Sequence, residues 1–387
     1  MTKKIGIVTG TRAEYGLLYR TIKILQESES VDTRVFVCGT HLSPEYGMTI
    51  DELMQDNVEN IVRVEMLMST NSRVGVAKSV GIATMSFADA FSREELDCLL
   101  VLGDRYEILA AAQTALILDV PIAHIHGGEV TEGAFDEAIR HSITKMANIH
   151  FPVAEEFARR ILQLGEPSSH IFVVGSPGID NIVNEPRMGL CELQESLGFS
   201  INPPLALVTY HPVTKASGKQ ENDIKPLIQS IKDNPDVLYV ITYPNADGGG
   251  KDIIEQWSQI SDSSNVKIVP SLGFKRYLSI MEHVAFVIGN SSSGIIEAPT
   301  FDVTTINIGS RQKGRPRAAS IIDVDMEHKQ INDAIKKCQA NYLKPSVTVT
   351  DNPYGQGDAA QKIASLLVEL NFSDFKNKSF EDISFAE

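Results

Sequence analysis

Short, continuously apolar runs recur along the whole chain, and each is followed by a longer stretch in which the apolar residues have helical spacing. The runs in the first half are Ile5–Val8, Thr33–Cys38, Cys98–Leu102, Ile122–Ile125, His150–Val153 and Ile171–Val174. Those in the second half are Leu205–Thr209, Val237–Ile241, Val266–Val269, Ala285–Ile288 and Thr304–Ile308. A strand that is apolar at every position is typical of a parallel sheet buried on both faces by crossover helices. The alternation of strands and helices therefore predicts an α/β architecture.

Glycine and proline mark a boundary near the middle of the chain, in the segment GSPG at 175–178 and again in NPP at 202–204. Each half then holds enough strands for a doubly wound sheet of its own. We therefore expect two Rossmann-like domains, residues 1–178 and residues 179–356. Because such sheets bind ligands at the carboxyl ends of their strands, two facing domains of this kind predict a ligand cleft between them.

The overall charge narrows the classes of partner. The 387 residues include 35 Lys and Arg against 50 Asp and Glu, so the formal net charge is −15. Proteins that bind nucleic acid or anionic membranes generally carry a basic face, so we expect neither partner, whereas a small phosphorylated ligand needs only a few local cations. No run approaches the roughly 18 apolar residues of a membrane helix. The N-terminus also lacks the apolar region of a signal peptide, so we expect a cytoplasmic location.

The four cysteines are scattered along the chain and include no C-x-x-C pair. They are Cys38, Cys98, Cys191 and Cys338. This spacing favours neither a zinc site nor a disulfide framework, and it fits a reducing compartment.

Two polar motifs follow apolar runs in the first half. The segment Gly10–Gly16 reads GTRAEYG and lacks the G-x-G-x-x-G pattern of dinucleotide-binding folds. A glycine turn with an arginine at a helix start still suits a phosphate, and the alternative is an ordinary turn with a surface arginine. The second motif places Asp104 beside Arg105, which is either a catalytic pair or an ion pair that braces the loop.

The densest cluster of ionisable residues comes shortly afterwards. Its members are His124, His126, Glu129, Asp136, Arg140 and His141. Strand alternation would place His124 and His126 on one face, and Asp136, Arg140 and His141 have the spacing of one side of a helix start. Metal binding, buried structural polar groups and acid–base chemistry are all open interpretations. No further His or Cys completes a usual zinc pattern, so acid–base chemistry is favoured.

Polar motifs also follow the strands of the second half. His211 ends one strand, a glycine loop before Lys251 ends the next, and the segment GNSSSG at 289–294 ends a third and opens a helix. Small hydroxyl residues at a helix N-terminus form an anion site, although an ordinary N-cap looks the same. Glu297 could accept both hydroxyls of a ribose. The segment 311–317 adds four cations, as diphosphate contacts or as a solvated loop. Together these motifs predict a nucleotide-sugar site.

As an ordered set, these motifs resemble the UDP-N-acetylglucosamine 2-epimerase family, and more closely its hydrolysing branch from bacterial sialic-acid-type pathways. The motifs are GTRAEY at 10–15, GDR at 103–105, HGGE at 126–129, HP at 211–212, GNSS at 289–292 and RQKGR at 311–315. The resemblance covers nearly the whole chain, as far as NPYG at 352–355. It implies a fold like that of the B-type glycosyltransferases, with a final helix in residues 357–375 that crosses back onto the first domain. The remaining residues, 376–387, form a polar tail that we expect to be loosely ordered.

The resemblance implies an enzyme that needs no metal and no cofactor and that assembles as a homodimer or homotetramer. The reaction would convert UDP-N-acetylglucosamine and water to N-acetylmannosamine and UDP, by anti elimination through 2-acetamidoglucal, for sialic-acid-type surface sugars. The nearest alternative substrate is UDP-N,N'-diacetylbacillosamine, which leads to legionaminic acid. A glycosyltransferase of the same architecture is an alternative from a different class.

By position, the resemblance implies a catalytic carboxylate at Asp104, a second catalytic acid at Asp136 and a substrate-contacting arginine at Arg105. It implies ligand contacts at Arg12, His211, Asn245, Lys251, Ser291, Ser292, Glu297 and Arg311. Among these, Glu297 would contact the ribose, and the uracil would lie against the backbone near Val269.

One position departs from the pattern of the non-hydrolysing relatives. They carry a catalytic glutamate where this chain has His126. Glu129, three residues further on, is either its substitute or a structural residue. The candidate catalytic set is therefore Asp104, Asp136, His211, His126 and Glu129.

Overall fold

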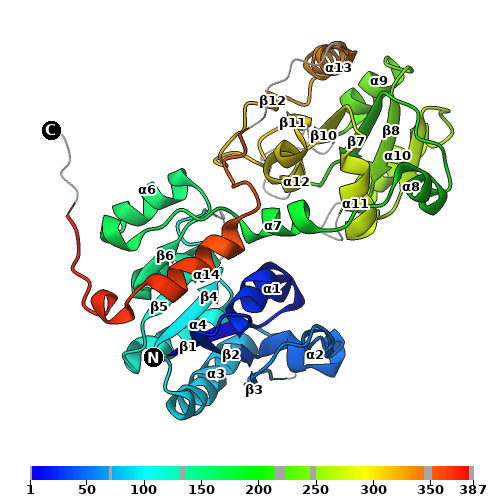
Figure 1. The fold of residues 1–387 in the computed structure, drawn as a ribbon. Coiled ribbons are helices and arrows are strands. Elements are labelled where there is room, and N and C mark those ends of the chain that lie inside the picture. The colour runs from blue at the N-terminus through cyan, green and yellow to red at the C-terminus, as the bar shows by residue number, and fades with distance from the viewer. Residues whose placement is uncertain are drawn as a thin grey trace. The chain divides into compact units, whose positions relative to one another are not determined.

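The strands within the described part of the chain form two parallel sheets of six strands each (Figure 1). The computed structural model describes residues 2–68, 72–130, 136–213, 223–244, 250–343 and 351–382. Unit 1 joins the residues up to Asn181 with those from Tyr354 onward, and unit 2 runs from Ile182 to Pro353. The predicted α/β class with two doubly wound sheets is confirmed.

The two sheets share one topology. Sheet order is β3-β2-β1-β4-β5-β6 in unit 1 and β12-β11-β10-β7-β8-β9 in unit 2. The strands of unit 1 are β1 (Lys3–Thr9), β2 (Val31–Val37), β3 (Ile61–Arg63), β4 (Cys98–Leu102), β5 (Ile122–Ile125) and β6 (Ile149–Phe151). Those of unit 2 are β7 (Leu205–Thr209), β8 (Leu238–Thr242), β9 (Val266–Val269), β10 (Phe286–Gly289), β11 (Thr304–Ile308) and β12 (Ile321–Val324). In each sheet the strand order reverses at one point, between β1 and β4 and between β7 and β10, and ligands bind beyond that point in folds of this type.

The continuous apolar runs are explained by two cores, one on each face of a sheet. In β4, Cys98, Leu100 and Leu102 pack into one core of unit 1, whereas Leu99 and Val101 pack into the other. In β7, Ala206 and Val208 face one core of unit 2, and Leu205 and Leu207 face the other. Each of these side chains is at most 5% exposed. Both faces of the strand are therefore apolar because both are covered.

Helices cover both sheets (Figure 1). The helices up to the middle of the chain are α1 (Arg12–Gln26), α2 (Ile50–Gln55), α3 (Arg73–Glu94), α4 (Tyr106–Ile117), α5 (Asp136–Met146), α6 (Glu155–Gln163) and α7 (Pro177–Asn184). They are followed by α8 (Leu190–Leu197), α9 (Lys225–Lys232), α10 (Gly250–Trp257), α11 (Gly273–Met281), α12 (Ser292–Ile296), α13 (His328–Leu343) and α14 (Ala359–Glu369). The last of these, α14, lies beside α1 and contributes Ile363, Ala364 and Leu367 to the core of unit 1.

One predicted strand is absent from the structure, and two strands of the structure were not predicted. The run Ile171–Val174 is not a strand: Ile171 forms only an isolated bridge with His150. The sixth strand of unit 1 is instead β3, which has only three residues and a partly exposed surface. In unit 2 the short strand β12 completes the sheet, and its four residues are partly or fully exposed. Short strands with incomplete burial do not produce a continuous apolar run.

The last described segment of the chain, from α14 to residue 382, packs against the N-terminal part of unit 1. Asp180 accepts hydrogen bonds from the backbone N–H groups of Ala359 and Ala360, at 3.0 and 2.6 Å, and so caps the start of α14. At the other end of α14, the Lys3 ammonium donates to the carbonyl oxygen of Leu370 at 2.7 Å. The segment after α14 was expected to be loosely ordered from residue 376, yet Lys378 in that segment forms several contacts with unit 1.

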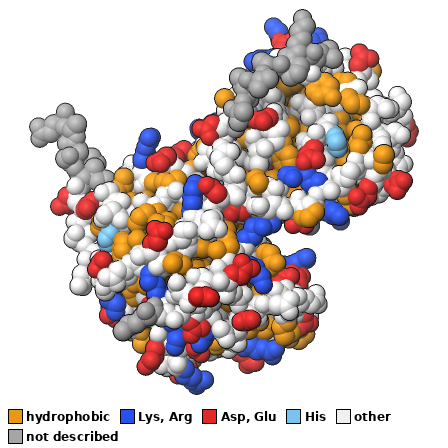
Figure 2. Space-filling view, viewed as in Figure 1, with side chains coloured by type: hydrophobic (Ala, Val, Ile, Leu, Met, Phe, Trp, Pro, Cys, Tyr) orange, Lys and Arg blue, Asp and Glu red, His pale blue; other side chains and the backbone are white. Residues whose placement is uncertain are grey.

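Surface chemistry is mixed on the face shown in Figure 2, where Lys and Arg side chains lie among Asp and Glu rather than in one basic stripe. Among the described helices, none combines the length and apolar character needed to cross a membrane. Within the same residues, no group of three or more His, Cys, Asp or Glu side chains is arranged to hold a metal ion.

Candidate active site

Polar side chains follow the strands at the switch point of each sheet. In unit 1, β1 leads into Gly10 and β4 leads into Gly103 and Asp104. In unit 2, β7 leads to His211 and β10 to Asn290. Because neighbouring parallel strands end at the same edge of a sheet, each unit gathers its own polar residues there.

Asp104 is the central carboxyl of unit 1. It forms an ion pair with the Arg140 guanidinium, which projects from α5, and the Asp104 side chain is 20% exposed. Burial raises the pKa of Asp104, the positive charge of Arg140 opposes that rise, and the carboxylates of Asp136 and Glu129 add to it. A partly buried carboxyl held between opposing charges is the kind of group that carries out proton transfer.

His124 is a structural histidine. It is fully buried on β5, and burial lowers its pKa to about 3, so it is neutral. Its Nε2 lies 2.8 Å from the carbonyl oxygen of Gly103 and must donate there, because a carbonyl only accepts. Its Nδ1 lies 3.3 Å from the hydroxyl of Thr144 on α5. His124 therefore ties the loop before Asp104 to the helix that carries Arg140.

His126 behaves differently. Since β5 ends at Ile125 and His126 has a left-handed backbone with φ of 65°, strand alternation does not extend to it, and the predicted pairing of His126 with His124 on one face is wrong. The Nδ1 of His126 lies 2.5 Å from Oε1 of Glu129. Its Nε2 is buried and has no hydrogen-bond partner among the residues described. The positive φ of His126 redirects the chain directly after β5.

The turn after His126 requires glycine. Gly128 has φ of 76°, and a Cβ there would lie 2.4 Å from the carbonyl oxygen of Phe157. This close approach lets the chain reverse directly after His126, so that Glu129 returns to its imidazole.

Helix α5 presents its residues to two different partners. Arg140 reaches Asp104, and Thr144, one turn later, reaches His124. His141 points elsewhere, since its Nε2 lies 3.9 Å from Glu137 of the same helix. Of the predicted trio on one side of α5, the contacts therefore join Arg140, but not His141, to the carboxyl cluster, and Asp136 joins it through its charge.

The Gly10 loop is closed by a side chain of its own helix. Glu14 Oε2 accepts hydrogen bonds from the backbone N–H groups of Gly10 and Thr11, at 2.8 and 3.1 Å, while the Thr11 hydroxyl accepts from the N–H of Glu14. These two N–H groups, which the sequence suggested for a phosphate, are therefore occupied by a carboxyl group. Burial raises the pKa of Glu14 to about 7, and nearby Glu107 adds to the rise.

The two arginines of this edge face carboxylates. Arg105 makes two hydrogen bonds to the buried Glu107, at 2.8 and 3.2 Å, and lies 3.9 Å from Glu14. Arg12 pairs with Glu52 at 2.9 Å, and its side chain is 74% exposed. Arg105 is thus held in place, whereas Arg12 lies on the surface with an exposed partner.

In unit 2, Asn290 locks the ends of two strands together. Its side chain accepts from the N–H of His211 at 2.7 Å and donates to the carbonyl oxygen of His211 at 2.8 Å. Gly289 permits this approach, because a Cβ there would lie 2.0 Å from the carbonyl oxygen of Thr209. His211, only 7% exposed, is therefore fixed at the switch point.

The start of α12 has the features of an anion site. Ser291 caps the helix by accepting from the N–H of Ser293, and Ser292 is the first helical residue. Arg311 donates from Nη1 to the carbonyl oxygen of Asn290 at 3.1 Å, which holds its guanidinium beside the helix start. Burial raises the pKa of Glu297 at the end of α12, and the hydroxyl of Tyr277 opposes that rise.

For the other predicted ligand contacts, the structure gives fewer interactions that would fix the side chain. Lys251 is exposed at the start of α10, and Val269 is partly buried at the end of β9. Arg317, in the predicted cationic segment, is bound to Asp323 at 3.0 Å. Asn245 lies outside the described residues.

Sequence reasoning missed three residues that shape the site. Glu14 closes the Gly10 loop, Thr144 supports His124, and Asn290 holds His211. The role of Glu14 could have been predicted from the sequence, since Thr11 and Glu14 have the T-x-x-E spacing of a capping box. Thr144 lies one turn beyond Arg140 on the same helix face.

Both units gather polar residues at the same point of the same topology, and the class that this defines is a two-domain α/β protein with ligand-binding positions at its switch points. A family model described as UDP-N-acetylglucosamine 2-epimerase matches residues 23–368. The chain belongs to this family, and the resemblance seen in the sequence motifs is confirmed.

Three relatives match over nearly their full length. The "GDP/UDP-N,N'-diacetylbacillosamine 2-epimerase (hydrolyzing)" of Campylobacter jejuni is 34% identical, covering 98% of this chain and 99% of the relative. The "Polysialic acid biosynthesis protein P7" of Escherichia coli is 36% identical, covering 98% and 97%. The "UDP-N,N'-diacetylbacillosamine 2-epimerase (hydrolyzing)" of Legionella pneumophila is 34% identical, covering 95% and 96%.

A solved structure shares the fold. The UDP-GlcNAc 2-epimerase of Neisseria meningitidis bound to UDP-GlcNAc superposes with a TM-score of 0.76 at 20% identity, covering 95% of this chain and 100% of that one. At this identity the likeness supports the predicted glycosyltransferase-B-like fold.

Proposed function

We propose that this protein is a hydrolysing 2-epimerase whose substrate is UDP-N,N'-diacetylbacillosamine. The products would be UDP and the free 2-epimeric sugar, 2,4-diacetamido-2,4,6-trideoxymannose. Two of the three relatives above are named for this hydrolysing reaction, which favours it over the UDP-N-acetylglucosamine reaction expected first from the motifs.

The reaction has two balanced halves. A base removes the proton at C2, the C1–O bond to the diphosphate breaks, and UDP leaves with the bonding electrons. Water then adds at C1 of the resulting glycal and releases a proton, while C2 receives a proton on the opposite face. The enzyme therefore needs a base, an acid and a site that stabilises the departing diphosphate.

The Asp104–Arg140 pair is the observation that carries this proposal. An ion pair keeps a partly buried carboxyl ionised, and an ionised carboxylate is the base that the first half requires. We propose that Asp104 is the base that removes the proton from C2. The charge of Asp136 acts on Asp104, and we propose Asp136 as a second catalytic carboxyl.

We propose that the His126–Glu129 pair supplies the second proton-transfer group. Glu129 fixes the imidazole through Nδ1, so that Nε2 is left as the proton-transferring atom. A base oriented by a carboxylate is a recurring arrangement in acid–base catalysis. We therefore propose that His126 transfers the proton and that Glu129 orients the imidazole of His126.

The residues of unit 2 are proposed to bind UDP. Ser291 and Ser292 at the start of α12, together with Arg311, would bind the diphosphate, and Glu297 would accept the ribose hydroxyls. His211 would lie near the diphosphate and the sugar. The remaining proposed ligand contacts are Arg12, Arg105, Asn245, Lys251 and Val269.

The test is a comparison of two substrates in heavy water. The purified protein is incubated with UDP-N,N'-diacetylbacillosamine or with UDP-N-acetylglucosamine, and UDP, the free sugar and deuterium at C2 are measured. We expect release of the 2-epimeric sugar with one deuterium at C2, and a higher kcat/KM for the diacetamido substrate. An intact sugar nucleotide in both reactions would reject the proposal, and glycosyl transfer would leave C2 without deuterium.

UDP-N-acetylglucosamine is the second candidate substrate. The family description and the relative from polysialic acid biosynthesis favour it. A higher kcat/KM for this substrate would keep the hydrolysing 2-epimerase and replace its sugar.

A further inference from the structure

The segment after α14 is anchored along unit 1, and we call residues 371–382 the C-terminal strap. Its first turn buries Phe372 and Phe375 in the core of unit 1. Asn148 then donates to the carbonyl oxygen of Phe375 at 2.9 Å, and Lys376 reaches Asp119 at 2.9 Å. The strap therefore follows a defined path along the unit.

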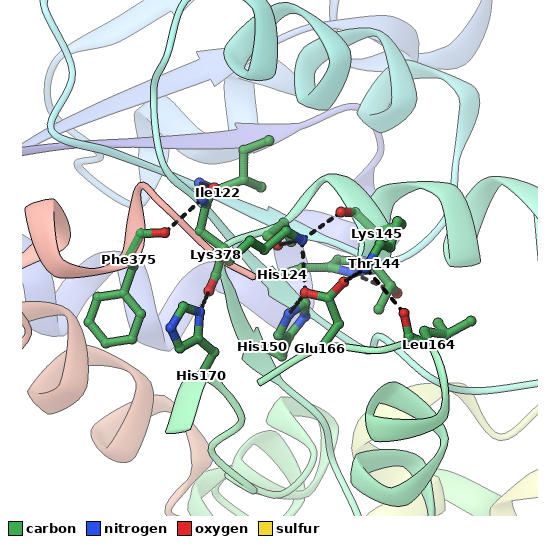
Figure 3. A network of polar contacts seen from close by, with 12 residues as sticks. Ile122, His124, Thr144, Lys145, His150, Leu164, Glu166, His170, Phe375 and Lys378 are labelled. Atoms are coloured by element: carbon green, nitrogen blue, oxygen red, sulfur yellow. Dashed lines mark hydrogen bonds and ion pairs between the residues drawn. The ribbon is translucent and has the colours of Figure 1, made fainter. Parts of the chain in front are cut away.

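Lys378 is the residue by which the strap meets α5 (Figure 3). Its ammonium donates to the carbonyl oxygens of Lys145 and Ala147, each at 2.6 Å, and to Glu166 Oε2 at 2.8 Å. An ammonium group has three N–H donors, so these three acceptors use its whole capacity. Two of them are carbonyls at the C-terminal end of α5, where backbone oxygens lack helical partners.

Glu166 is the anchor of this contact. It is fully buried and also meets Lys145 at 2.7 Å and His150 at 3.0 Å (Figure 3). Burial acts to raise the pKa of Glu166, but the hydrogen bonds from His150, Lys145 and Lys378 outweigh it and lower the pKa to about 2. A buried carboxylate with three basic neighbours holds them in a narrow geometry.

Residues of α5 on the N-terminal side of Lys145 contact the candidate active site. Arg140 pairs with Asp104, and Thr144 supports His124, which in turn binds the carbonyl of Gly103. The distance from Arg140 to Lys145 along the helix axis is about 7.5 Å. Because a helix of this length moves as a stiff body, a shift at Lys145 displaces Arg140 as well.

We propose that Lys378 is a positioning residue for the proton-transfer step: by binding the end of α5 and Glu166, it keeps Arg140 aligned with Asp104. This inference rests on the proposed function of Asp104. Lys378 lies in a segment where composition alone predicted loose order, and it touches neither Asp104 nor Arg140 in the described contacts.

The experiment compares Lys378→Met with Lys376→Met in the full-length protein. Lys376 is the matched control, because it belongs to the same strap but contacts exposed Asp119 rather than α5. We expect Lys378→Met to lower kcat about 10-fold, in line with the effect of small misalignments far from the reacting atoms. KM and the Kd of UDP should stay unchanged, and Lys376→Met should keep the wild-type kcat.

The pH profile separates positioning from a loss of folded protein. Asp104 is faced by Arg140 and Asp136 from α5 and by Glu129 from the turn after β5. Since Arg140 lowers the pKa of Asp104, a displaced Arg140 should move the acidic limb of kcat to higher pH. A lower amount of folded enzyme would scale the whole profile without moving it.

A wild-type kcat and pH profile in Lys378→Met, or an equal loss in Lys376→Met, would overturn the inference. If Lys378→Met does not fold, Lys378→Arg replaces it, because a planar guanidinium keeps the charge but cannot repeat the three contacts; the same fall in kcat is then expected, and a wild-type kcat counts against the role.

Amide hydrogen exchange keeps this inference separate from the proposed function. A wild type that turns over neither sugar nucleotide rejects the function by itself. In that case Lys378→Met should still speed exchange in the last turn of α5 relative to Lys376→Met, and equal exchange in the two variants would reject the positioning contact.

Discussion

The Nε2 atom of His124 donates a hydrogen bond of 2.8 Å to the carbonyl oxygen of Gly103, the residue before Asp104. The contact fixes the turn that presents the candidate base, and it is made by a histidine that does not titrate near neutral pH, because burial lowers its pKa to about 3. In the sequence, His124 belongs to one cluster with the candidate proton-transfer residues. In the structure, its role is to hold the loop before Asp104.

Replacing His124 by Leu should weaken both the fold and turnover. The carbonyl of Gly103 loses its donor, so we expect the free energy of unfolding in urea to fall by about 1–2 kcal/mol and kcat to fall with it. His124→Gln is the matched control, since its amide can still donate. Neither variant should remove a limb of the pH–rate profile, and the loss of a limb would show that His124 itself transfers a proton.

Asp104→Asn tests the candidate base. The amide keeps the size of the carboxyl but cannot accept the C2 proton, so kcat should fall by about a thousandfold. Calorimetry should show unchanged binding of UDP, because the proposed UDP contacts lie mainly in unit 2. An unchanged kcat would remove Asp104 from the mechanism.

His126→Gln and Glu129→Gln, measured side by side, assign the second proton-transfer group. If His126 transfers the proton and Glu129 orients it, His126→Gln should lose about 100-fold or more in kcat, and Glu129→Gln should lose less. The reverse order would make Glu129 the reacting group and His126 its support.

Glu14→Gln should change how stability depends on pH. The folded pKa of Glu14 is about 7, above its ordinary value of 4.5. Its contribution to stability is therefore complete below pH 4.5 and is lost as the pH rises toward 7. Glutamine cannot ionise, so the variant should gain stability relative to wild type as the pH rises between those values, and the gain should reach about 3 kcal/mol by pH 8. Urea unfolding at pH 4.5 and pH 8 measures the difference, and a constant difference would contradict a protonated Glu14.

Arg311→Met tests the proposed diphosphate site. Loss of a charged donor beside the start of α12 should weaken UDP binding about 10-fold or more. Arg317→Met is its control, since Arg317 is bound to Asp323 at 3.0 Å. Equal binding by the two variants would place the diphosphate elsewhere.

The fold was largely predictable because a strand buried on both faces appears in the sequence as a continuous apolar run. Leu99 and Leu100 are both apolar because each faces a separate core. This pattern fails where burial is incomplete, as in β3, which is too short and too exposed to stand out. It also misleads at Ile171–Val174, where Phe172 donates to His150 in β6 at 2.9 Å and Val174 donates to Pro152 at 3.1 Å without forming a regular ladder.

For the candidate site, the sequence pointed to candidate residues but not to the way in which they pair. Asp104 and Arg140 were both singled out, yet their ion pair spans 36 positions, and no local spacing encodes it. Alternation also failed at His126, because one left-handed residue directly after a strand turns the chain and redirects the next side chains. The occupied N–H groups of the Gly10 loop result from a capping box, whose T-x-x-E spacing is present in the sequence but is also compatible with an open phosphate loop.

Unit 1 is assembled from both ends of the chain, with Lys3 bound to the carbonyl of Leu370 and Asp180 capping α14. During synthesis, residues 182–353 of unit 2 leave the ribosome as one continuous stretch, whereas unit 1 has to wait for residues from Tyr354 onward before its core is complete. A chain that stops before α14 would lack Ile363, Ala364 and Leu367 and would therefore leave the core of unit 1, the part made first, incomplete. The unit that begins the chain can therefore be completed only after the whole of unit 2 has been made.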